Sequence, residues 1–354
     1  MLEDLKEYII RADKSLLETL VRINYLSEKL SALTLFVVDT ENRVVGSVTD
    51  GDIRRGLLKG IKLDESVDKV MSREFISLST NDFVYTKLKF IREKQIKLVP
   101  VLNGKGEIVK IVDFNLGRSY LPIDAVLMAG GKGERLRPMT LTCPKPLLLV
   151  ADKPIIDYNI DNLLRNGIEN INVTVNYLKE QIEAHFLAPR QNGVQVKCVR
   201  EPEYLGTMGS VKFVKCWNND TVLVMNSDLF TNINLEEFFL HFKEHNADMS
   251  VAAIPYSVNV PYGIFEIDNI REIKGIREKP SFHYFANAGI YLLKKEVLEF
   301  IPEKVFFNAT DLMELLIQKG RKVIRFPMSG YWVDIGKPED FKKVQELAKH
   351  IQKR

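Results

Sequence analysis

A glycine-rich segment followed by fixed cations is the part of the sequence best suited to chemistry. Met128-Ala-Gly-Gly-Lys-Gly-Glu-Arg-Leu-Arg-Pro138 is followed closely by Pro144-Lys145-Pro146. Because glycine has no Cβ, the backbone N–H groups of such a loop can approach a phosphate closely. Arg135 and Lys145 add two cations, which suits the negative charge that builds up in phosphoryl transfer. The pattern therefore predicts a phosphate-binding site with a role in phosphoryl transfer.

Two better-known phosphate-binding motifs fail on spacing. A Walker-type loop needs Gly-Lys followed by Ser or Thr, but Gly131-Lys132 is followed by Gly133. A dinucleotide-binding fingerprint needs a third glycine where Leu136 stands. A glycine loop alone could be a simple tight turn, so the prediction depends on the glycines together with Arg135 and Lys145.

A carboxylate at a candidate ligand-binding position follows a hydrophobic run later in the chain. Val224-Met-Asn-Ser-Asp228 ends in a carboxylate, and the run before it predicts a buried strand. Carboxylates at the carboxyl ends of strands in open α/β sheets lie where ligands bind. The alternative is that Asp228 only caps a turn.

The elements that must position these residues change in rhythm along the chain. After the segment 117–122, which predicts a linker, strands alternate with long amphipathic helices, and this favours a mixed, mainly parallel α/β sheet. We therefore expect two domains, residues 1–120 and residues 121–354. Strands are expected at Val126–Met128, Asn172–Asn176, Val222–Met225 and Ala247–Pro255, and helices at Ile155–Asn166, Glu180–Leu187, Val211–Cys216, Leu235–His245 and Lys337–Lys353.

The first 120 residues contain an internal repeat. Residues 35–48 and 99–112 share a strand–turn–strand pattern at an offset of about 64 positions, and each unit is too small to bury both faces alone. The region resembles a tandem pair of cystathionine β-synthase (CBS) domains, small α/β units. The resemblance implies that Thr49 and Asp52 contact an adenine nucleotide, the alternative being that Asp52 caps a helix. In the second copy Asp113 and Leu116 occupy these positions, so a nucleotide site is not expected there.

Residues 124–345 resemble the nucleotidyl-sugar pyrophosphorylases, which have a Rossmann-like fold. Besides the glycine-rich segment, the matching runs are Glu201-Pro-Glu-Tyr-Leu-Gly-Thr-Met-Gly209, with Met208 replacing a usual alanine, and Gly330-Tyr-Trp-Val-Asp-Ile-Gly336. The resemblance implies that Arg135 and Lys145 act on the reacting phosphates and that Asp228 and Asp334 hold Mg²⁺. These two aspartates lie 106 positions apart, so only the fold can bring them together. The resemblance further implies nucleotide contacts at Met128, Ala129, Gly130, Gly131, Gly133, Leu205, Gly206 and Thr207, and sugar-phosphate contacts at Gly263, Glu278, Lys279 and Asn287.

The expected reaction joins a nucleoside monophosphate from a triphosphate to a sugar-1-phosphate, with release of pyrophosphate. The run Glu201–Gly209, which resembles the base-recognising loop of the family, and the late segment Gly330–Gly336 look most like those of mannose-1-phosphate guanylyltransferases. GTP is therefore favoured, with mannose- or glucosamine-1-phosphate as the sugar. Uridylyl or thymidylyl transfer is the alternative, and so is a regulatory subunit that binds nucleotide without catalysis. A metal-dependent glycosyltransferase would usually carry an Asp-x-Asp motif, whereas Asn226-Ser-Asp228 has one aspartate.

Composition excludes several other classes of function. The formal net charge is only +3, and no basic run with interleaved aromatics appears, so nucleic acid is not expected as a partner. The N-terminus is acidic, unlike a signal peptide, and no apolar run approaches the roughly 18 residues of a membrane span. Three cysteines without metal-ligand spacing fit a cytoplasmic protein. We expect a homo-oligomer, and no acyltransferase domain after the final predicted helix.

Overall fold

The computed structural model describes residues 5–27, 33–79, 84–116, 118–190, 193–269 and 271–352. The chain divides into two compact units. The N-terminal unit comprises Met1–Pro122, Leu164–Ile168 and Gln191–Gly193; the C-terminal unit comprises Ile123–Leu163, Glu169–Arg190 and Val194–Arg354. The main division therefore lies two residues after the expected boundary at 120, just before the first strand of the large sheet. No helix in the described ranges is long and apolar enough to cross a membrane.

The N-terminal unit is built from two similar three-stranded sheets. In each, the first and second strands are parallel and the second and third are antiparallel. Thr34 pairs with Thr49 in the first sheet, and Leu98 pairs with Asp113 in the second. The offset of 64 positions is thus reproduced in the register, which confirms the repeat. The strands are β1 (Ile9–Arg11), β2 (Thr34–Val38), β3 (Val44–Thr49), β4 (Leu78–Ser79), β5 (Leu98–Leu102) and β6 (Ile108–Asp113).

Three helices accompany these sheets in the described part of the N-terminal unit: α1 (Leu16–Ser27), α2 (Asp50–Leu58) and α3 (Val84–Glu93). The core of the first sheet buries one face of α1, through Leu16, Ile23 and Leu26. Apolar residues at this spacing lie on one side of a helix, which is why the segment packs as a helix on the sheet. Short 3₁₀ helices lie at Leu5–Tyr8, Val67–Lys69 and Phe114–Leu116.

The C-terminal unit is organised around a mixed sheet that has seven strands among the described residues, in the order β11-β10-β7-β12-β17-β14-β18. All neighbouring pairs are parallel except the two that involve β17, which runs against the others. The expected mainly parallel α/β fold is therefore confirmed. The strands are β7 (Asp124–Ala129), β10 (Ile171–Val175), β11 (Lys197–Arg200), β12 (Thr221–Asn226), β14 (Met249–Asn259), β17 (Ser281–Lys294) and β18 (Val323–Pro327).

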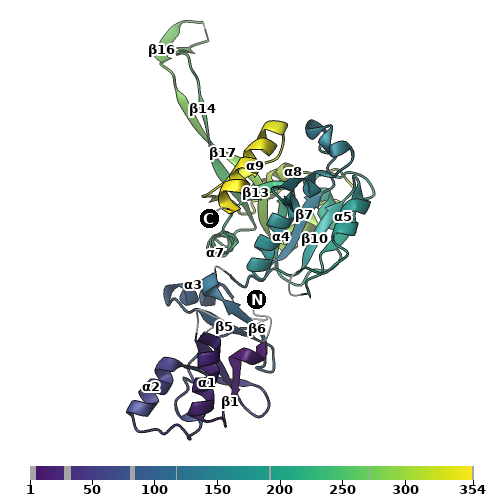
Figure 1. The fold of residues 1–354 in the computed structure, drawn as a ribbon. Helices are drawn as coiled ribbons and strands as arrows, with labels where there is room; N and C mark the ends of the chain where they lie inside the picture. The colour runs from purple at the N-terminus through teal and green to yellow at the C-terminus, as the bar shows by residue number, and fades with distance from the viewer. Residues whose placement is uncertain are drawn as a thin grey trace. The chain divides into compact units, whose positions relative to one another are not determined.

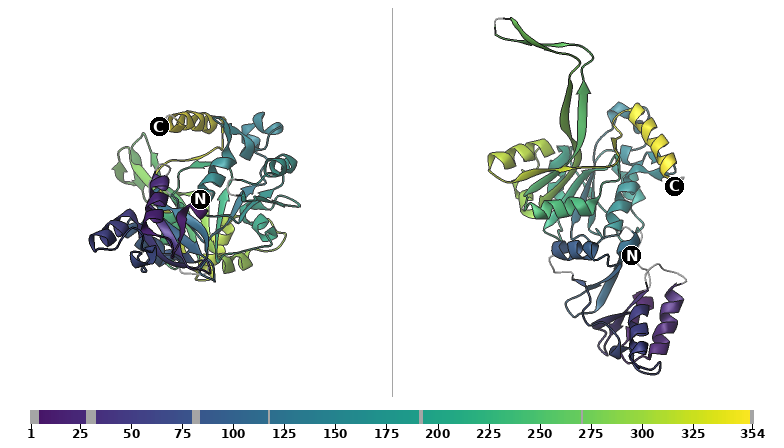
Figure 2. Two further views of the ribbon diagram at one scale, coloured as in Figure 1. Left: turned by 60° about the horizontal axis from the view of Figure 1, so that its bottom comes forward. Right: turned by 90° about the vertical axis from the view of Figure 1, so that its left-hand side faces the viewer.

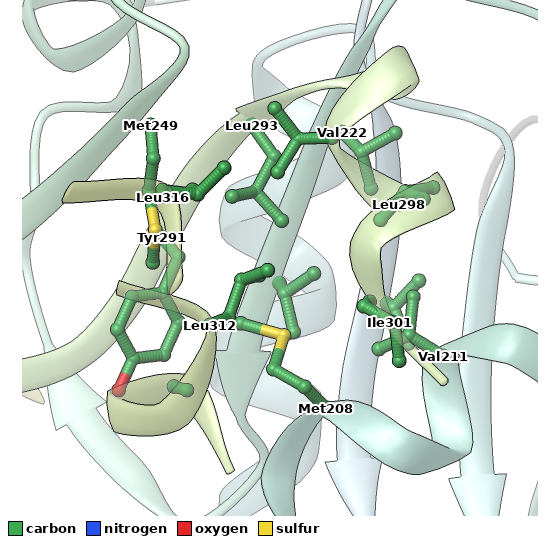
Figure 3. Packing of buried hydrophobic residues seen from close by; sticks show 14 of the residues in the cluster. Met208, Val211, Val222, Met249, Tyr291, Leu293, Leu298, Ile301, Leu312 and Leu316 are labelled. Atoms are coloured by element: carbon green, nitrogen blue, oxygen red, sulfur yellow. The ribbon is translucent and has the colours of Figure 1, made fainter. Parts of the chain in front are cut away.

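Helices cover both faces of this sheet. On one face, Val222 and Leu293 of the strands pack against Leu312 and Leu316 of α8 (Ala309–Gln318) (Figure 3). On the opposite face, the Phe326 ring of β18 lies 4.9 Å from that of Phe238 in α7 (Leu235–Glu244). Successive side chains of a strand point to opposite faces of the sheet, and helices cover both faces. The central strands are therefore buried on both sides, which explains their continuous hydrophobic runs. The remaining helices are α4 (Ile155–Arg165), α5 (Lys179–His185), α6 (Gly206–Gly209) and α9 (Pro338–Gln352).

One expected helix was wrong. The segment expected as a helix at Val211–Cys216 forms a short 3₁₀ helix, Ser210–Phe213, that follows α6 directly. Met208 and Val211 are both buried in the core against α8 (Figure 3). This tertiary packing favours the tighter 3₁₀ backbone over the expected α-helix. Other 3₁₀ turns lie at Glu134–Leu136, Met139–Leu141, Lys145–Leu147 and Lys295–Phe300.

Strands β14 and β17 continue beyond the sheet as a two-stranded arm. β14 pairs with β18 only as far as Ala253, but it stays paired with β17 through Asn259. At the tip, β15 (Ile264–Ile267) pairs with β16 (Ile273–Arg277). Figure 1 and the right view of Figure 2 show this arm leaving the sheet as a long ribbon.

A small two-stranded sheet brings the end of the chain beside the middle of the sequence. β13 (Leu229–Thr231) pairs antiparallel with β19 (Trp332–Asp334), and Leu229 lies opposite Asp334. Ile335 and α9 then pack against Leu136 of the glycine-rich segment in a separate apolar cluster. A further short pair joins β8 (Leu149–Val150) to β9 (Lys153–Pro154).

Candidate active site

A cavity of about 580 Å³ lies at the carboxyl ends of the parallel strands of the C-terminal unit. Its size falls in the range of small-molecule and cofactor sites. The residues that follow the strands β7, β10, β11 and β12 all contribute to its wall, as expected for the ligand crevice of an open α/β sheet. Of the residues expected from the sequence, Met128, Ala129, Gly130, Gly131, Gly133, Arg135, Lys145, Gly206, Thr207 and Asp228 line it.

The glycine-rich loop needs its glycines for close approach and for backbone conformation. A Cβ on Gly130 would stand 2.5 Å from Glu201 Oε1, so a carboxylate lies directly against the loop. Gly133 adopts φ +60°, a left-handed conformation that favours glycine. Thr140 Oγ1 donates a hydrogen bond of 2.8 Å to the carbonyl oxygen of Gly133 and so holds this part of the loop. A Cβ on Gly133 would also stand 3.3 Å from Lys145 Cβ, which places the lysine beside the loop.

Lys145 joins the two aspartates that the sequence separates. Its Nζ is paired with Asp228 Oδ2 and lies 3.5 Å from Asp334 Oδ1. Asp228 lies two residues after the end of β12. Asp334 is the last residue of β19, which pairs with β13. Ser227 ties this region to the glycine-rich loop, because its Oγ donates to the carbonyl oxygen of Met128 at 2.6 Å. The structure therefore brings Lys145, Asp228 and Asp334 into one cluster.

The charges of this cluster are not balanced by the lysine. Asp228 Oδ1 is buried and has no hydrogen-bond partner among the residues that the structure describes. Burial and the nearby Asp228 carboxylate raise the pKa of Asp334, and Lys145 and Arg135 partly oppose this. A buried carboxylate oxygen without a partner is costly, so the cluster fits an additional cation. Within the described ranges no group of three or more His, Cys, Asp or Glu side chains could hold a metal.

Arg135 lines the same cavity and lies beside Gly336. A Cβ added at Gly336 would lie 3.5 Å from one terminal nitrogen of its guanidinium group. Gly336 follows the second aspartate by two positions and also lines the cavity. In the described part of the chain, no carboxylate within 4.0 Å forms an ion pair with Arg135. Arg135 opposes the rise in the pKa of Asp334, and because it lines the cavity its charge can also act on an anion bound there.

In the run Glu201–Gly209, the expected base-recognising loop, some residues line the cavity and others are buried in the core. Gly206 and Thr207 line the cavity, and Gly206 has φ +77° where a Cβ would stand 2.8 Å from the Phe307 carbonyl oxygen. Thr207 Oγ1 accepts a 2.7 Å hydrogen bond from the backbone N–H of Ala309 and so helps to hold the start of α8. Leu205 is buried and does not line the cavity; its carbonyl oxygen accepts from Phe307 N at 3.0 Å. Met208, which replaces the usual alanine, is buried in the core beside α8.

Most of the residues expected to bind the sugar phosphate lie on the arm. Gly263 and Glu278 come together there, since a Cβ on Gly263 would lie 2.9 Å from Glu278 Oε2. Neither these two residues nor Lys279 lines the cavity. Asn287 lies nearer to it: its Oδ1 accepts from Gly289 N at 2.9 Å, and a Cβ on Gly289 would meet the cavity residue Asn226 at 2.7 Å.

The cavity wall also contains residues to which the sequence analysis assigned no role, among them Asn176 and Glu201. Each follows the last residue of a parallel strand, β10 or β11, as the expected Gly130 follows β7. That position was the available signal. Glu201 is buried, and burial raises the pKa of its carboxyl group, while hydrogen bonds from Leu205 N–H and the hydroxyl groups of Thr174 and Ser210 partly offset this.

In the N-terminal unit, the two residues expected to contact a nucleotide bind each other. Thr49 is the N-cap of α2, and its Oγ1 donates to Asp52 Oδ2 at 2.7 Å, while Asp52 N donates to Thr49 Oγ1 at 3.3 Å. This is a reciprocal capping arrangement, which stabilises the start of the helix. Arg55 also pairs with Asp52 from the next turn.

Comparison with known proteins finds relatives that are named as nucleotidyltransferases for sugar-1-phosphates. The uridylyltransferase for UTP and glucose-1-phosphate of Synechocystis is 29% identical over 236 residues, covering 61% of this chain and 61% of the relative. The mannose-1-phosphate guanylyltransferase of Mycobacterium tuberculosis is 30% identical over 225 residues, covering 62% of each. A crystal structure from Bacillus anthracis, assigned as a glucose-1-phosphate thymidylyltransferase and crystallised with sucrose, superposes with a TM-score of 0.51 at 26% identity, covering 64% of this chain and 95% of that one.

The chain thus spans about three-fifths of the length of these curated relatives. A family model for the CBS domain matches residues 4–59, which include the first copy of the repeat, while the second copy lies outside this range. The family model described as nucleotidyl transferase matches residues 124–350, well over half of the chain. The chain is therefore a member of the nucleotidyl transferase family that carries a CBS domain before the nucleotidyl transferase domain.

Proposed function

We propose that the chain transfers a nucleoside monophosphate from a triphosphate to a sugar-1-phosphate, with GTP as the favoured triphosphate. The observation that carries this proposal is the cluster of Lys145, Asp228 and Asp334 beside the glycine-rich loop. Lys145, Asp228 and the loop line one cavity, and Asp334, which is not among the lining residues, pairs with Lys145. Glycine backbone N–H groups can contact phosphate oxygens, while Lys145 and Arg135 neutralise charge. The relatives named above act on sugar-1-phosphates, as their names state, with uridylyl or guanylyl transfer.

The reaction needs no covalent intermediate with the protein. A phosphate oxygen of the sugar-1-phosphate attacks the α-phosphorus of the triphosphate, and a new P–O bond forms. The bond from the α-phosphorus to the bridging oxygen breaks, and pyrophosphate leaves with the electron pair. Because the attacking oxygen is already ionised, no side chain has to remove a proton. Positioning and charge neutralisation by Arg135 and Lys145 are then the main contributions of the protein.

Asp228 and Asp334 are the residues that would hold Mg²⁺. The buried, unpartnered Oδ1 of Asp228 is the acceptor that fits such an ion. Two carboxylates with phosphate oxygens of the substrate are a common ligand set for Mg²⁺. When bound, the ion would supply positive charge to the triphosphate and help to orient it.

Glu201 supports guanine as the base. Its carboxylate lies against Gly130 on the cavity wall. Guanine presents N1–H and the exocyclic N2 amino group side by side, so it offers two donors to a carboxylate. Uracil and thymine present one N–H donor between two carbonyl oxygens, which a carboxylate repels. A buried carboxylate at this place therefore favours GTP over UTP and dTTP.

The sugar side rests on the sequence resemblance. We assign Lys279 to the sugar phosphate, and Gly263, Glu278 and Asn287 to the sugar. Since Gly263, Glu278 and Lys279 lie on the arm, this assignment requires the arm to approach the cavity described above when the sugar phosphate binds. Mannose-1-phosphate and glucosamine-1-phosphate are the sugars to test first.

The test is pyrophosphate release with Mg²⁺ from GTP, UTP, dTTP, CTP or ATP, each combined with mannose-, glucose- or glucosamine-1-phosphate. We expect release with GTP and one of these sugars. Release with UTP or dTTP alone would overturn the base assignment but keep the reaction. If GTP binds in calorimetry while no combination releases pyrophosphate, the regulatory-subunit alternative would replace the enzyme.

We also propose that the first copy of the repeat binds an adenine nucleotide through Thr49 and Asp52. The capping arrangement between them would have to open to free their oxygens. Calorimetry of the full chain with AMP and with ATP tests this: we expect binding that Asp52→Ala weakens and that Leu116→Ala, at the matching position of the second copy, leaves unchanged. No heat at millimolar nucleotide would refute it.

A further inference from the structure

Asn159 is a polar side chain in the middle of the buried face of helix α4. Only 3% of its surface is exposed, and its neighbours on this face, Ile155, Ile156, Ile160 and Leu163, are all buried. A buried amide is costly unless its polar atoms are hydrogen-bonded, so burial alone would favour an apolar residue here. The hydrogen bonds that Asn159 makes therefore indicate its role.

The amide group of Asn159 donates to the backbone on both sides of Asp228. Its Nδ2 lies 2.9 Å from the carbonyl oxygen of Leu229 and 3.4 Å from that of Ser227. An amide nitrogen carries two hydrogens, so one side chain can serve both carbonyl groups. Asn159 thus holds the turn that carries Asp228 from both ends.

The same turn is held from two other sides. The N–H and the Oγ of Ser227 both donate to the carbonyl oxygen of Met128, at 3.3 Å and 2.6 Å, which ties the turn to the glycine-rich segment. The carbonyl oxygen of Asp228 accepts from the N–H of Ile335 at 3.3 Å, and Ile335 directly follows Asp334. Helix α4 supplies the third support of the turn.

One oxygen of the Asp228 carboxylate has no protein partner that could fix it. Oδ2 pairs with Lys145, while Oδ1 is buried and has no hydrogen-bond partner among the described residues. The position of the carboxylate therefore depends largely on the backbone turn that carries it. Because Leu229 lies opposite Asp334 in the ladder of β13 and β19, a shift of this turn would also change the separation of the two carboxylates.

We propose that Asn159 is a positioning residue, which holds the turn around Asp228 so that Asp228 and Asp334 keep the separation that suits a divalent cation. This inference rests on the proposed function, in which these two aspartates hold Mg²⁺. Asn159 itself does not line the cavity, so it acts only through the backbone of its neighbours. Mg²⁺ demands a near-ideal ligand geometry, and removing a group that orients a metal ligand typically lowers metal affinity about 10- to 100-fold.

The test is the binding of Mn²⁺ by the full chain without nucleotide, followed by the electron paramagnetic resonance signal of the free ion. Mn²⁺ takes the same oxygen ligands as Mg²⁺. Asn159→Leu fills a similar volume on an apolar helix face but cannot donate, and it should raise the dissociation constant about tenfold. A constant within about twofold of that of the unaltered chain would overturn the proposal. An unaltered chain that binds no Mn²⁺ at millimolar concentration would also overturn it.

Asn162 provides a matched control on the same helix. Its Nδ2 donates to the carbonyl oxygen of Ile233 at 3.2 Å, a bond of the same kind but further along the chain from Asp228. Asn162→Leu should leave Mn²⁺ binding unchanged, and thermal unfolding followed by circular dichroism checks that both variants are folded. Asn159→Ala should show the same loss as Asn159→Leu and takes its place if the leucine variant does not fold. Equal losses at the two positions would assign the effect to α4 as a whole and refute the proposal.

A double-variant cycle separates positioning from general stability. Asp228→Asn should already weaken Mn²⁺ binding strongly. If Asn159 acts through Asp228, adding Asn159→Leu to this variant should weaken binding no further. Losses that add in the double variant would show that Asn159 acts by another route.

Pyrophosphate release supplies a second readout and separates this inference from the proposed function. In Asn159→Leu, the Mg²⁺ concentration that gives half of the maximal rate should rise about tenfold, while the KM for the sugar-1-phosphate at saturating Mg²⁺ stays constant. If no substrate pair gives pyrophosphate but Asn159→Leu weakens Mn²⁺ binding as expected, the proposed reaction is refuted and the positioning role is supported. An unchanged Mg²⁺ requirement in an active Asn159→Leu variant would overturn the positioning role.

Discussion

The residues that the sequence predicted to form the site meet at the cavity in one case and stay away from it, on the arm, in the other. Around the cavity, Lys145, Asp228 and Asp334 come from distant parts of the chain and meet within hydrogen-bonding or ion-pair distance. On the arm, Gly263 and Glu278 meet each other but stay out of the cavity wall. Asp228 follows strand β12 of the large sheet, Asp334 ends β19 of the small sheet, and Lys145 begins a 3₁₀ turn beside the glycine-rich loop. Gly263 and Glu278 belong to the outer part of a ribbon whose two strands pair only with each other, so packing within the unit fixes the first set, while the position of the second set depends on the ribbon itself.

The largest expected effect is on the cavity side of this comparison. Asp228→Ala should lower the rate of pyrophosphate release about 1,000-fold or more, because several kcal/mol of charge stabilisation at the phosphates would be lost. Asp220→Ala is the matched control: its side chain is 92% exposed and pairs only with Lys295 in the described structure, so its activity should stay within about twofold. If Asp228→Ala retains more than a tenth of the rate of pyrophosphate release, the cluster has no role in the mechanism.

The next effect concerns the base. Glu201→Gln should shift the ratio of kcat/KM for GTP over UTP by about 10- to 100-fold toward UTP, because one charged hydrogen-bond acceptor is replaced by a group that also donates. Glu203→Gln, two residues later on the exposed part of the same loop, is the control and should leave the ratio unchanged. An unchanged ratio in Glu201→Gln would mean that this carboxylate does not contact the base.

The arm side of the comparison should respond more weakly. Lys279→Ala should raise the KM for the sugar-1-phosphate about tenfold while the KM for the triphosphate stays constant, since one charge-assisted contact to a single substrate is lost. Lys274→Ala, near the tip of the same arm, should have no effect on either KM. If Lys279→Ala leaves both values unchanged, the arm has no part in sugar binding and serves only other purposes.

The smallest effect is a change with pH. Burial raises the pKa of Glu201, so its protonated form persists to a higher pH than in an ordinary glutamate. As the pH falls through this raised pKa, the carboxylate is lost, and selectivity for GTP over UTP should fall, about twofold when half of the sites are protonated. The ratio in Glu201→Gln should be flat over the same range. A ratio in the unaltered chain that is equally flat would show that the ionised form is not needed for base choice.

Much of the cavity could be predicted from the sequence because its chemistry is local. Glycines beside cations need no tertiary knowledge, and an aspartate after a hydrophobic run marks a strand end. Glu201 was assigned no role because its strand, β11, is short and only half-buried, and it lacks a strong hydrophobic signal. The strand expected to end at Pro255 continues to Asn259, because its extension is maintained by pairing with β17, a contact that the local sequence does not contain.

In the N-terminal unit, the sequence predicted the repeat down to its register. The offset of 64 positions was visible because both copies keep the same alternation of apolar residues. Helix capping by Asp52 was the alternative to a nucleotide contact, and in the structure Thr49 is the N-cap while Asp52 completes the capping box from the third helical position. The same residue types serve for capping and for contacting a nucleotide, so only the geometry separates the two roles.

The ladder between β13 and β19 has a consequence for how the protein folds. Lys145 lies 83 positions from Asp228 and 189 positions from Asp334, yet all three must meet. Contacts at such separations close large loops and form slowly, whereas the repeat in the first 120 residues depends on pairings between neighbouring strands. We therefore expect the catalytic cluster to be assembled late, after the central strands have paired. A refolding experiment should then recover native secondary structure before it recovers nucleotide binding.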